Sequence, residues 1–255
     1  MYPQLSIILP ALNEAGVIAQ TLQSSQTLRA QGCEVIVVDG GSSDETESLA
    51  LPLADRVLRS APGRAHQMNL GAGTARAPIL LFLHADTQLP EQASEIILHA
   101  LSAQDRVWGR FDVRLSGSRK TFRLIEALMN LRSRLTGIAT GDQAIFVLRE
   151  AFFEVGCYPN IALMEDIALS AALKKIGPPI TLRDRVITSS RRWETQGVWR
   201  TILRMWWLRL RNFLGADPAR LAQTYDTRAD VDTLHKPVPV FEPPATHIVT
   251  QVPHD

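Results

Sequence analysis

The sequence predicts an α/β protein: a mostly parallel β-sheet that helices cover on both faces. In the first half of the chain, short apolar segments alternate with longer segments of helical periodicity. The apolar segments are continuous and do not alternate with polar residues, so we expect both faces of each strand to be buried. A repeated strand–helix order of this kind is typical of parallel sheets.

Each element of the first half has a local signal. Pro10 ends the first strand, Asp39-Gly40-Gly41 ends the second, and Gly32 stops the helix between them. Ser42 and Glu45 have the spacing of a capping box, which predicts that a helix begins at Ser42. The expected strands are 5–9, 34–38, 56–58 and 78–83. The expected helices are 14–30, 42–51, 64–75 and 90–101.

The second half of the chain is less regular. Strands are expected at 107–115, 144–148 and 180–187. Helices are expected at 118–135, 165–176 and 196–214; the first and last of these are basic and amphipathic. Prolines recur after Asp226 and periodicity fades, so 226–255 is predicted to be a loosely ordered tail that follows a single domain over 1–225.

The composition excludes several classes of protein. A net charge of +1 argues against a general nucleic-acid binder. The longest apolar runs are a few residues long, which is too short to cross a bilayer, and the N-terminus lacks the features of a signal peptide. Two cysteines, Cys33 and Cys157, are too few for a disulfide framework or a zinc site. A cytoplasmic domain is therefore expected.

Carboxylates follow two of the predicted strands, at the sheet edge where α/β proteins bind ligands. Asp39 directly follows the second strand and can either accept hydrogen bonds from a base or ribose or cap the next helix. Asp86 follows the fourth strand. It can ligate a hard divalent cation together with waters and phosphate oxygens, or it can be a solvated loop acid.

Other charged residues stand at predicted helix starts. Glu165 and Asp166 open a helix, where they either favour the helix dipole or provide a general base. Arg64 also opens a helix and is either a phosphate ligand or a surface cation. Asp142 and Gln143 precede a strand and can form a turn.

Taken in order, these motifs resemble the family-2 glycosyltransferases of the GT-A fold, over roughly residues 4–225. The motifs are 10–14 (PALNE), 38–44 (VDGGSSD), 84–86 (HAD), 165–166 (ED) and 191–193 (RRW). Segments 63–69, 141–143, 163–166 and 190–194 resemble more narrowly a small bacterial subfamily, whose genes often lie beside radical-SAM or selenoprotein-type genes.

The resemblance implies a role for each motif. Asp86 would hold Mg²⁺ or Mn²⁺ against the donor diphosphate, and Asp166 would be the catalytic base. The residues implied to bind the donor are Pro10, Ala11, Glu14, Asp39, Arg64 and Asp86. Those implied to lie near the acceptor or the diphosphate are Asp142, Gln143, Glu165, Arg191, Arg192 and Trp193. Two positions depart from the family: His84 replaces the first aspartate of its DxD motif, and Ser190 replaces a glutamine that processive members carry.

The leading interpretation is an inverting glycosyltransferase that uses a nucleotide-sugar donor, with UDP the commonest nucleotide of such donors in the family. One alternative is a nucleotide-binding or membrane-docking module without catalysis, which His84 favours. A sugar-phosphate nucleotidyltransferase would need a glycine-rich, basic loop after the first strand, and residues 10–14 contain neither glycine nor a basic residue.

The two basic helices allow two interpretations. Residues 196–214 contain four arginines and no acid, next to a broad apolar arc. Residues 118–135 are likewise rich in basic residues. Such helices either pack on the core with one solvated stripe or lie in a membrane interface. The second interpretation predicts peripheral contact with the inner face of the cell membrane and a lipid-linked acceptor.

Overall fold

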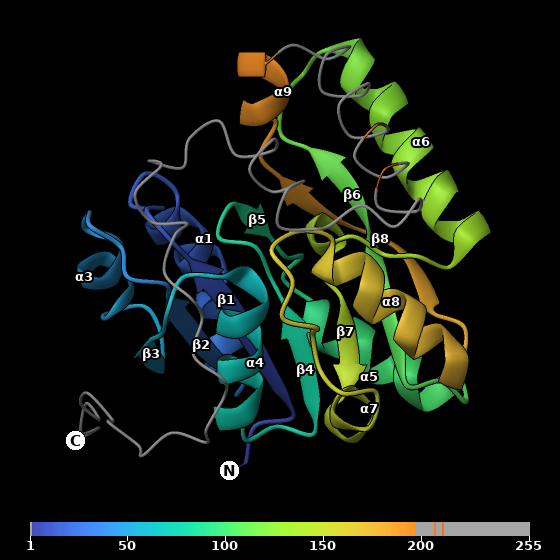
Figure 1. Ribbon diagram of the computed structural model, residues 1–255, viewed down its shortest axis with the longest axis horizontal. Helices are drawn as coiled ribbons and strands as arrows, with labels where there is room; N and C mark the ends of the chain where they lie inside the picture. Colours follow the sequence, from blue (N-terminus) through green and yellow to red (C-terminus); the bar gives the residue numbers. More distant parts are fainter. Residues whose placement is uncertain (1, 197–206, 208–210, 212–255) are drawn as a thin grey trace.

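The computed structural model describes residues 2–196 together with Trp207 and Arg211 (Figure 1). The helix expected over 196–214 lies outside the described residues except for Gln196, Trp207 and Arg211. The tail expected over 226–255 lies outside them entirely.

One eight-stranded sheet forms the centre of the described chain, in the order β3-β2-β1-β4-β7-β6-β8-β5. Its strands are β1 (Leu5–Ala11), β2 (Glu34–Asp39), β3 (Arg56–Arg59), β4 (Ile79–Phe82), β5 (Thr87–Gln88), β6 (Trp108–Leu115), β7 (Phe146–Leu148) and β8 (Ile180–Thr188). Strands β3, β2, β1 and β4 are parallel, as expected. The other half is mixed, because β7 runs antiparallel to both β4 and β6, and β5 runs antiparallel to β8.

Helices cover both faces of this sheet, which confirms the predicted class (Figure 1). They are α1 (Ile18–Ser24), α2 (Gln26–Ala30), α3 (Thr46–Ala50), α4 (Arg64–Thr74), α5 (Ala93–Ala103), α6 (Lys120–Thr136), α7 (Arg149–Glu154), α8 (Glu165–Ile176) and α9 (Arg191–Gln196). Ile7 and Leu9 of β1 pack on the side of α1 and α5, whereas Ile8 packs on the side of α4, α7 and α8. All seven residues of β1 are buried, as the continuous apolar pattern predicts.

Two helix boundaries differ from the sequence prediction for the same reason. The capping box at Ser42 is wrong: α3 begins at Thr46, and the Ser42 hydroxyl instead donates to Asp39 and accepts from the Asn13 amide. The helix expected from residue 14 begins only at Ile18. The amides at the start of that segment bond to side chains of residues 42–46, so they are held outside a helix.

Helix α6, predicted over 118–135, covers an open edge of β6. Strand β7 pairs with β6 only at Trp108 and Gly109, so within the described chain the later backbone groups of β6 have no strand partner on that side. Asn130 accepts from the Val113 amide at 2.9 Å and donates to the Val113 carbonyl at 3.1 Å. Glu126 accepts from the Leu115 amide at 2.6 Å. These two polar side chains are buried because they replace the missing strand.

A buried ion-pair network lies beneath the same helix. Arg110 is fully buried on β6 and pairs with Asp112, which also pairs with Arg134 of α6. Burial lowers the pKa of Arg110, and the Asp112 carboxylate opposes that shift. The network therefore depends on Asp112 to balance a guanidinium group that water does not reach.

Glu34 forms a second buried site, at the start of β2. Its carboxylate accepts from the Ser6 hydroxyl at 2.7 Å and from the Arg76 side chain at 2.8 Å, and it pairs with Arg56 at 3.1 Å. Burial alone would raise the pKa of Glu34, but the hydrogen bonds from Arg76 and Ser6 and the charge of Arg56 lower it below 4.5.

Glu34→Gln is therefore expected to lower the free energy of unfolding at neutral pH by about 1–3 kcal/mol. A carboxyl group with a lowered pKa in the folded state contributes stability above its unfolded pKa and loses it as the pH falls. Urea denaturation at several pH values should thus show a shallower loss of stability for the variant below pH 4.5 than for the wild type. Glu47→Gln, in an exposed pair with Arg59, is the control. Equal acid sensitivity of wild type and Glu34→Gln would contradict the assignment.

None of the helices in the described part of the chain is both long enough and apolar enough to cross a membrane.

Candidate active site

The carboxyl ends of β1, β2 and β4 lie at one edge of the sheet, because these strands are parallel neighbours. Pro10 and Ala11 are the last two residues of β1 and are buried, and Ala11 lies beside Asp39 in register. Gln67 of α4 clamps this edge: its amide donates to the carbonyls of Ala11 and Val38, both at 2.8 Å. Gln67 lies in the segment 63–69 that resembles the bacterial subfamily, but sequence reasoning did not predict these two hydrogen bonds.

The loops after β1 and β2 are tied to each other. The Asn13 amide donates to the Ser42 hydroxyl at 2.9 Å, and the Asn13 side chain accepts from the Ser43 amide at 2.9 Å. The Ala15 amide donates to Asp44 at 3.1 Å. Asn13 adopts a φ of 53°, a conformation that asparagine tolerates better than most residues. Together the two loops form one ordered rim of the site.

Asp39 is 2% exposed, and its carboxylate closes the loop that follows it. It accepts from the amides of Gly41 at 3.0 Å and Ser42 at 2.9 Å, and from the Ser42 hydroxyl. The helix-capping interpretation of Asp39 is wrong, because α3 begins only at Thr46 and Asp39 bonds within its own loop. Recognition of a nucleotide base by Asp39 stays a prediction.

Six charged residues from distant parts of the sequence share one electrostatic environment, and we refer to them as the charged cluster. They are Glu14, Arg64, Asp86, Glu165, Asp166 and Arg191. Arg64 pairs with Glu165 at 3.1 Å, and Arg191 pairs with Glu14 at 3.6 Å. With four carboxylates and two guanidinium groups, the charged cluster has an excess of negative charge.

Burial and neighbouring carboxylates shift the pKa values of three groups at this site. Burial raises the pKa of Glu165, and Asp166 adds to that shift while Arg64 opposes it. Burial and then Asp86 raise the pKa of Glu14, against the charge of Arg191. Tyr158, which sequence reasoning missed, is buried, and burial followed by Asp166 and Glu165 raises its pKa well above 10.0.

The carboxylate of Asp166 is held from two sides. One oxygen accepts from the Gly141 amide at 2.7 Å, and the other accepts from the amide of Ile167 at 2.7 Å. Gly141 in turn lies against the ring of His84, since a Cβ added at Gly141 would come 2.3 Å from His84 Nε2. His84, Gly141 and Asp166 are thus successive neighbours, and Asp166 remains partly exposed.

Gly141→Ala is expected to displace either the His84 ring or the loop, because the added methyl group has no room. The amide that orients Asp166 would move with the loop, so we expect turnover to fall about tenfold or more while the fold is retained. Gly73→Ala is the matched control, since a Cβ at Gly73 meets nothing within 4 Å. Turnover and circular dichroism of both variants test this. Normal turnover in Gly141→Ala would show that the contact is not required.

Asp86 connects the charged cluster with a small cavity. Its side chain is partly exposed, and it accepts from the Thr87 hydroxyl at 3.4 Å. The cavity has a volume of about 220 Å³ and is lined by Val17, Gln20, Thr21, Asp86, Gln88, Ser116, Ile187, Thr188 and Ser189. Ligand pockets usually measure about 300–1,000 Å³, so this cavity alone is too small for a whole nucleotide sugar.

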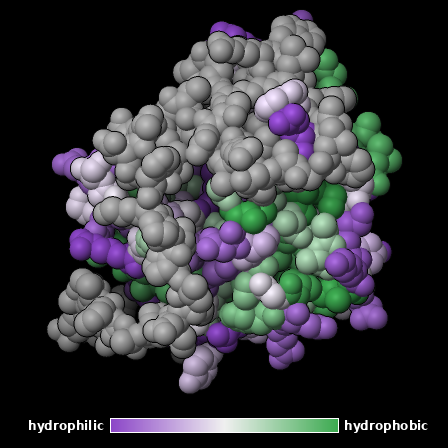
Figure 2. All heavy atoms as spheres, in the orientation of Figure 1, coloured by the Kyte–Doolittle hydropathy of each residue, from purple (hydrophilic) through white to green (hydrophobic). Residues whose placement is uncertain are grey.

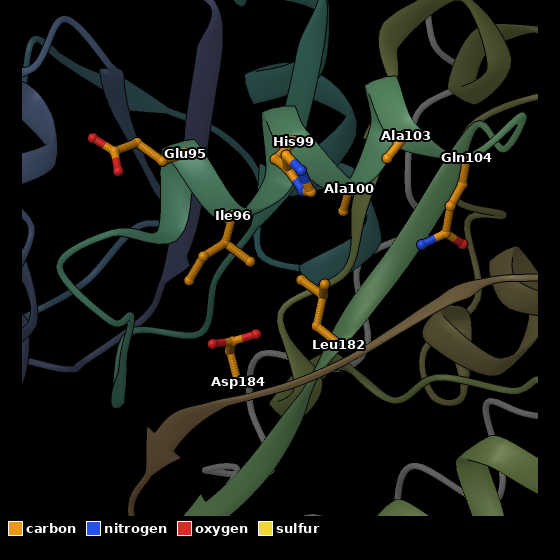
Figure 3. A pocket seen from close by; sticks show the side chains of 8 residues that line it. All are labelled: Glu95, Ile96, His99, Ala100, Ala103, Gln104, Leu182 and Asp184. Atoms are coloured by element: carbon orange, nitrogen blue, oxygen red, sulfur yellow. The ribbon is translucent and has the colours of Figure 1, made fainter.

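A larger cavity of about 460 Å³ lies elsewhere, between α5 and β8 (Figure 3). Its lining is Glu95, Ile96, His99, Ala100, Ala103, Gln104, Leu182 and Asp184. None of the residues predicted for the site lines it, so its size does not make it the candidate active site.

The structure separates some of the residues predicted to lie near the acceptor or the diphosphate. Gln143 is fully buried and its side chain closes the turn at η1 (Gly141–Gln143), whereas Asp142 is partly exposed there. Trp193 packs against a cluster formed by Leu115, Phe122 and Ile125, under α6. Arg192 lies in α9, and its side chain is outside the described part of the structure. A ligand contact for these residues stays a prediction.

Comparison with known proteins gives consistent matches. Residues 6–157 match the profile of a family described as glycosyl transferase family 2. The chain is 26% identical over 225 residues to the probable glycosyltransferase YdaM of Bacillus subtilis (strain 168). That alignment covers 77% of this chain and 53% of YdaM, so the chain spans about half the length of this relative.

Two solved structures share the fold. One is S. aureus TarS 1–349 in complex with UDP-GlcNAc, with a TM-score of 0.59 and 15% identity over 73% of this chain and 58% of that one. The other is the mannosyltransferase PcManGT from Pyrobaculum calidifontis in complex with GDP-Man and Mn²⁺. Its TM-score is 0.59 and its identity is 20%, over 88% of this chain and 65% of that one.

Proposed function

Because this chain belongs to glycosyl transferase family 2 and has the GT-A fold, we propose that it transfers a sugar from a nucleotide-diphosphate sugar to an acceptor hydroxyl, with inversion. The observation that carries the proposal is the charged cluster at the carboxyl edge of the parallel strands. There Asp86 follows β4, and Asp166 stands at the start of α8 beside the Arg64–Glu165 pair. Asp166 thus shares a cluster with Asp86, a candidate metal ligand, and with two arginines. This set of charges suits a reaction in which a diphosphate leaves, because positive charge stabilises the departing group.

The donor would lie on the rim formed by the loops after β1 and β2. Pro10, Ala11, Glu14 and Asp39 would line the nucleotide pocket, and we favour a UDP sugar. The bound UDP-GlcNAc of TarS and the bound GDP-Man of PcManGT support a nucleotide sugar as the class of donor. Arg64 and Arg191 would face the diphosphate, since both lie in the charged cluster with exposed side chains.

Asp166 would accept the proton of the acceptor hydroxyl as that oxygen attacks the anomeric carbon. A new glycosidic bond forms on one face while the bond to the diphosphate oxygen breaks on the other. The nucleoside diphosphate leaves with the electron pair, and a single displacement inverts the configuration. The two amides that bond to Asp166 would keep its carboxylate in one orientation during this step.

The site fits Mg²⁺ or Mn²⁺, with Asp86 as the protein ligand. The charged cluster has an excess of carboxylates, which a divalent cation would balance. Among residues 2–196, Trp207 and Arg211, no three side chains of histidine, cysteine, aspartate or glutamate form a ready-made metal site. A metal held by one carboxylate would take its other ligands from water and phosphate oxygens, as Mg²⁺ commonly does. When bound, such an ion supplies positive charge that stabilises the departing diphosphate.

Thermal shifts with UDP, GDP and dTDP sugars, with and without Mn²⁺, test donor and metal together. The true donor at 100 times its Kd is expected to add about 2.7 kcal/mol to the free energy of unfolding, and part of this should require Mn²⁺. Asp86→Ala should lose the part that depends on metal, whereas Asp184→Ala, in the cavity between α5 and β8, should behave like the wild type. Hydrolysis or transfer of the donor sugar then separates an enzyme from a binding module. A metal-independent shift identical in Asp86→Ala would contradict the metal assignment.

We also infer a membrane-proximal role. The acceptor would be lipid-linked, and the protein would act at the inner face of the cell membrane, consistent with the basic segments 118–135 and 196–214. The motifs at 63–69 and 190–194 further favour the radical-SAM- and selenoprotein-associated subfamily.

A further inference from the structure

The outer side of α6 carries a row of leucines that the described fold leaves uncovered. Leu124, Leu128, Leu131 and Leu135 are 60%, 55%, 51% and 77% exposed, and we call them the leucine face. Their spacing of four, three and four residues keeps them within about 60° of one another around the helix and spreads them over about 16 Å of its length. Figure 2 shows hydrophobic atoms along the outer edge where Figure 1 places α6.

The leucine face is not needed to hold α6 in place. The opposite side of the helix already anchors it, through the apolar contacts of Phe122 and Ile125 and the hydrogen bonds of Glu126 and Asn130 to β6. A row of exposed leucines on an otherwise anchored helix usually marks a partner surface.

Positive charge lies at both ends of the leucine face. Arg119 and Lys120 are exposed at the start of α6, and Lys174 of α8 donates to the Thr136 carbonyl at its end. The only acid within 118–136 is Glu126, whose side chain is 7% exposed and bonds to β6. The surroundings of the leucine face along α6 are therefore basic.

The structure changes which cations can contact a partner. Arg123 donates to the carbonyls of Leu115 and Gly117, and Arg134 pairs with Asp112, so these two arginines attach α6 to the fold. Part of the positive charge of the basic helix predicted from sequence therefore serves to hold α6 on the fold. Its outward surface is the leucine face with cations at its ends.

This charge pattern distinguishes between the partners that an apolar surface can have. A second copy would bring two basic rims together along α6 without an exposed carboxylate on either helix to pair with them. The chain's own segment 197–214 has four arginines and no acid, and so has the same charge sign. An anionic surface with an apolar interior complements both the leucines and the cations.

We propose that the leucine face of α6 docks on an anionic phospholipid membrane. The four leucines enter the boundary of the acyl chains, and Arg119 and Lys120 contact the head groups. This surface rests on the membrane-proximal part of the proposed function. Its binding to lipid can be measured without any assay of enzyme turnover.

Sedimentation with lipid vesicles tests the proposal on the full chain. Wild type is expected to pellet with phosphatidylcholine–phosphatidylglycerol vesicles at low salt, and much less with phosphatidylcholine alone. The double variant Leu128→Gln/Leu131→Gln should bind the anionic vesicles roughly ten- to a hundredfold more weakly, because two apolar side chains are lost. Leu51→Gln, at a leucine that is 46% exposed next to α3, should bind like wild type.

Three outcomes would overturn the proposal. The first is that the wild type fails to pellet with anionic vesicles. The second is that the double variant pellets as well as the wild type. The third is a concentration-dependent dimer that the double variant abolishes, with no vesicle binding. Circular dichroism checks that the double variant is folded. Hydrolysis of a soluble nucleotide sugar by the same variant separates this proposal from the proposed function, since turnover in solution does not require the leucine face.

Discussion

Asp166→Asn is expected to reduce sugar transfer by at least about a hundredfold, because general-base assistance typically contributes 10²–10⁴-fold. Asparagine has nearly the same shape as aspartate but cannot take the proton of the acceptor hydroxyl. Donor binding should survive, since Asp166 is not among the residues proposed to bind the donor. The measurements are the rate of transfer from the donor identified by thermal shift and the size of that shift in the variant.

The hydrogen bonds of Asp166 show which control this experiment needs. Asp166 accepts one hydrogen bond from Gly141 and one from Ile167, and asparagine can accept only one of the two through its single side-chain oxygen. The melting temperature of the variant therefore has to be measured beside its activity. Asp184→Asn changes a carboxylate in the cavity between α5 and β8 and should leave transfer unchanged. Near-normal turnover in Asp166→Asn would remove this residue from the mechanism.

Asp112→Ala is expected to lower the free energy of unfolding by about 3–5 kcal/mol. The substitution leaves the Arg110 guanidinium, which is fully buried, without the carboxylate that balances its charge. It also removes the partner of Arg134 and so loosens α6 from β6. Urea denaturation should show a lower midpoint with little change in slope.

A second ion pair provides the comparison for Asp112. Glu47 pairs with Arg59, whose side chain is 72% exposed, so Glu47→Ala should cost no more than about 1 kcal/mol. If Asp112→Ala cost as little as Glu47→Ala, the buried network would not be a source of stability.

Much of the fold could be predicted because its signals are local. The continuous apolar runs at β1 and β2 predict strands buried on both faces, and the structure confirms this residue by residue. The two-residue strand β5 and the short helix α7 were missed, since segments of this length carry too little periodicity. The mixed half of the sheet was not predicted either, because the direction in which β7 pairs depends on the chain's path and not on its residues alone.

The candidate site was predicted in its location but not in its connections. Polar residues after parallel strands must meet at one edge of the sheet, so Glu14, Asp39 and Asp86 could be expected there. The Arg64–Glu165 pair joins residues 101 positions apart, and the Gly141–Asp166 hydrogen bond joins residues 25 positions apart. No spacing in the sequence indicates such pairs, since they arise only when α4, η1 and α8 pack above the same edge.

The sequence by itself determined the α/β class, the seven longer strands and the edge at which the carboxylates gather, because burial patterns and strand ends are properties of neighbouring residues. Tertiary structure decided which side of α6 faces inward. Hydrophobicity alone would bury the leucines and expose Glu126 and Asn130, yet the structure does the reverse. The physical reason is the unpaired edge of β6, whose backbone groups need hydrogen-bond partners that leucine cannot provide. Because Glu126 and Asn130 face β6, the leucine face lies on the outside of α6, where we propose that it contacts a membrane.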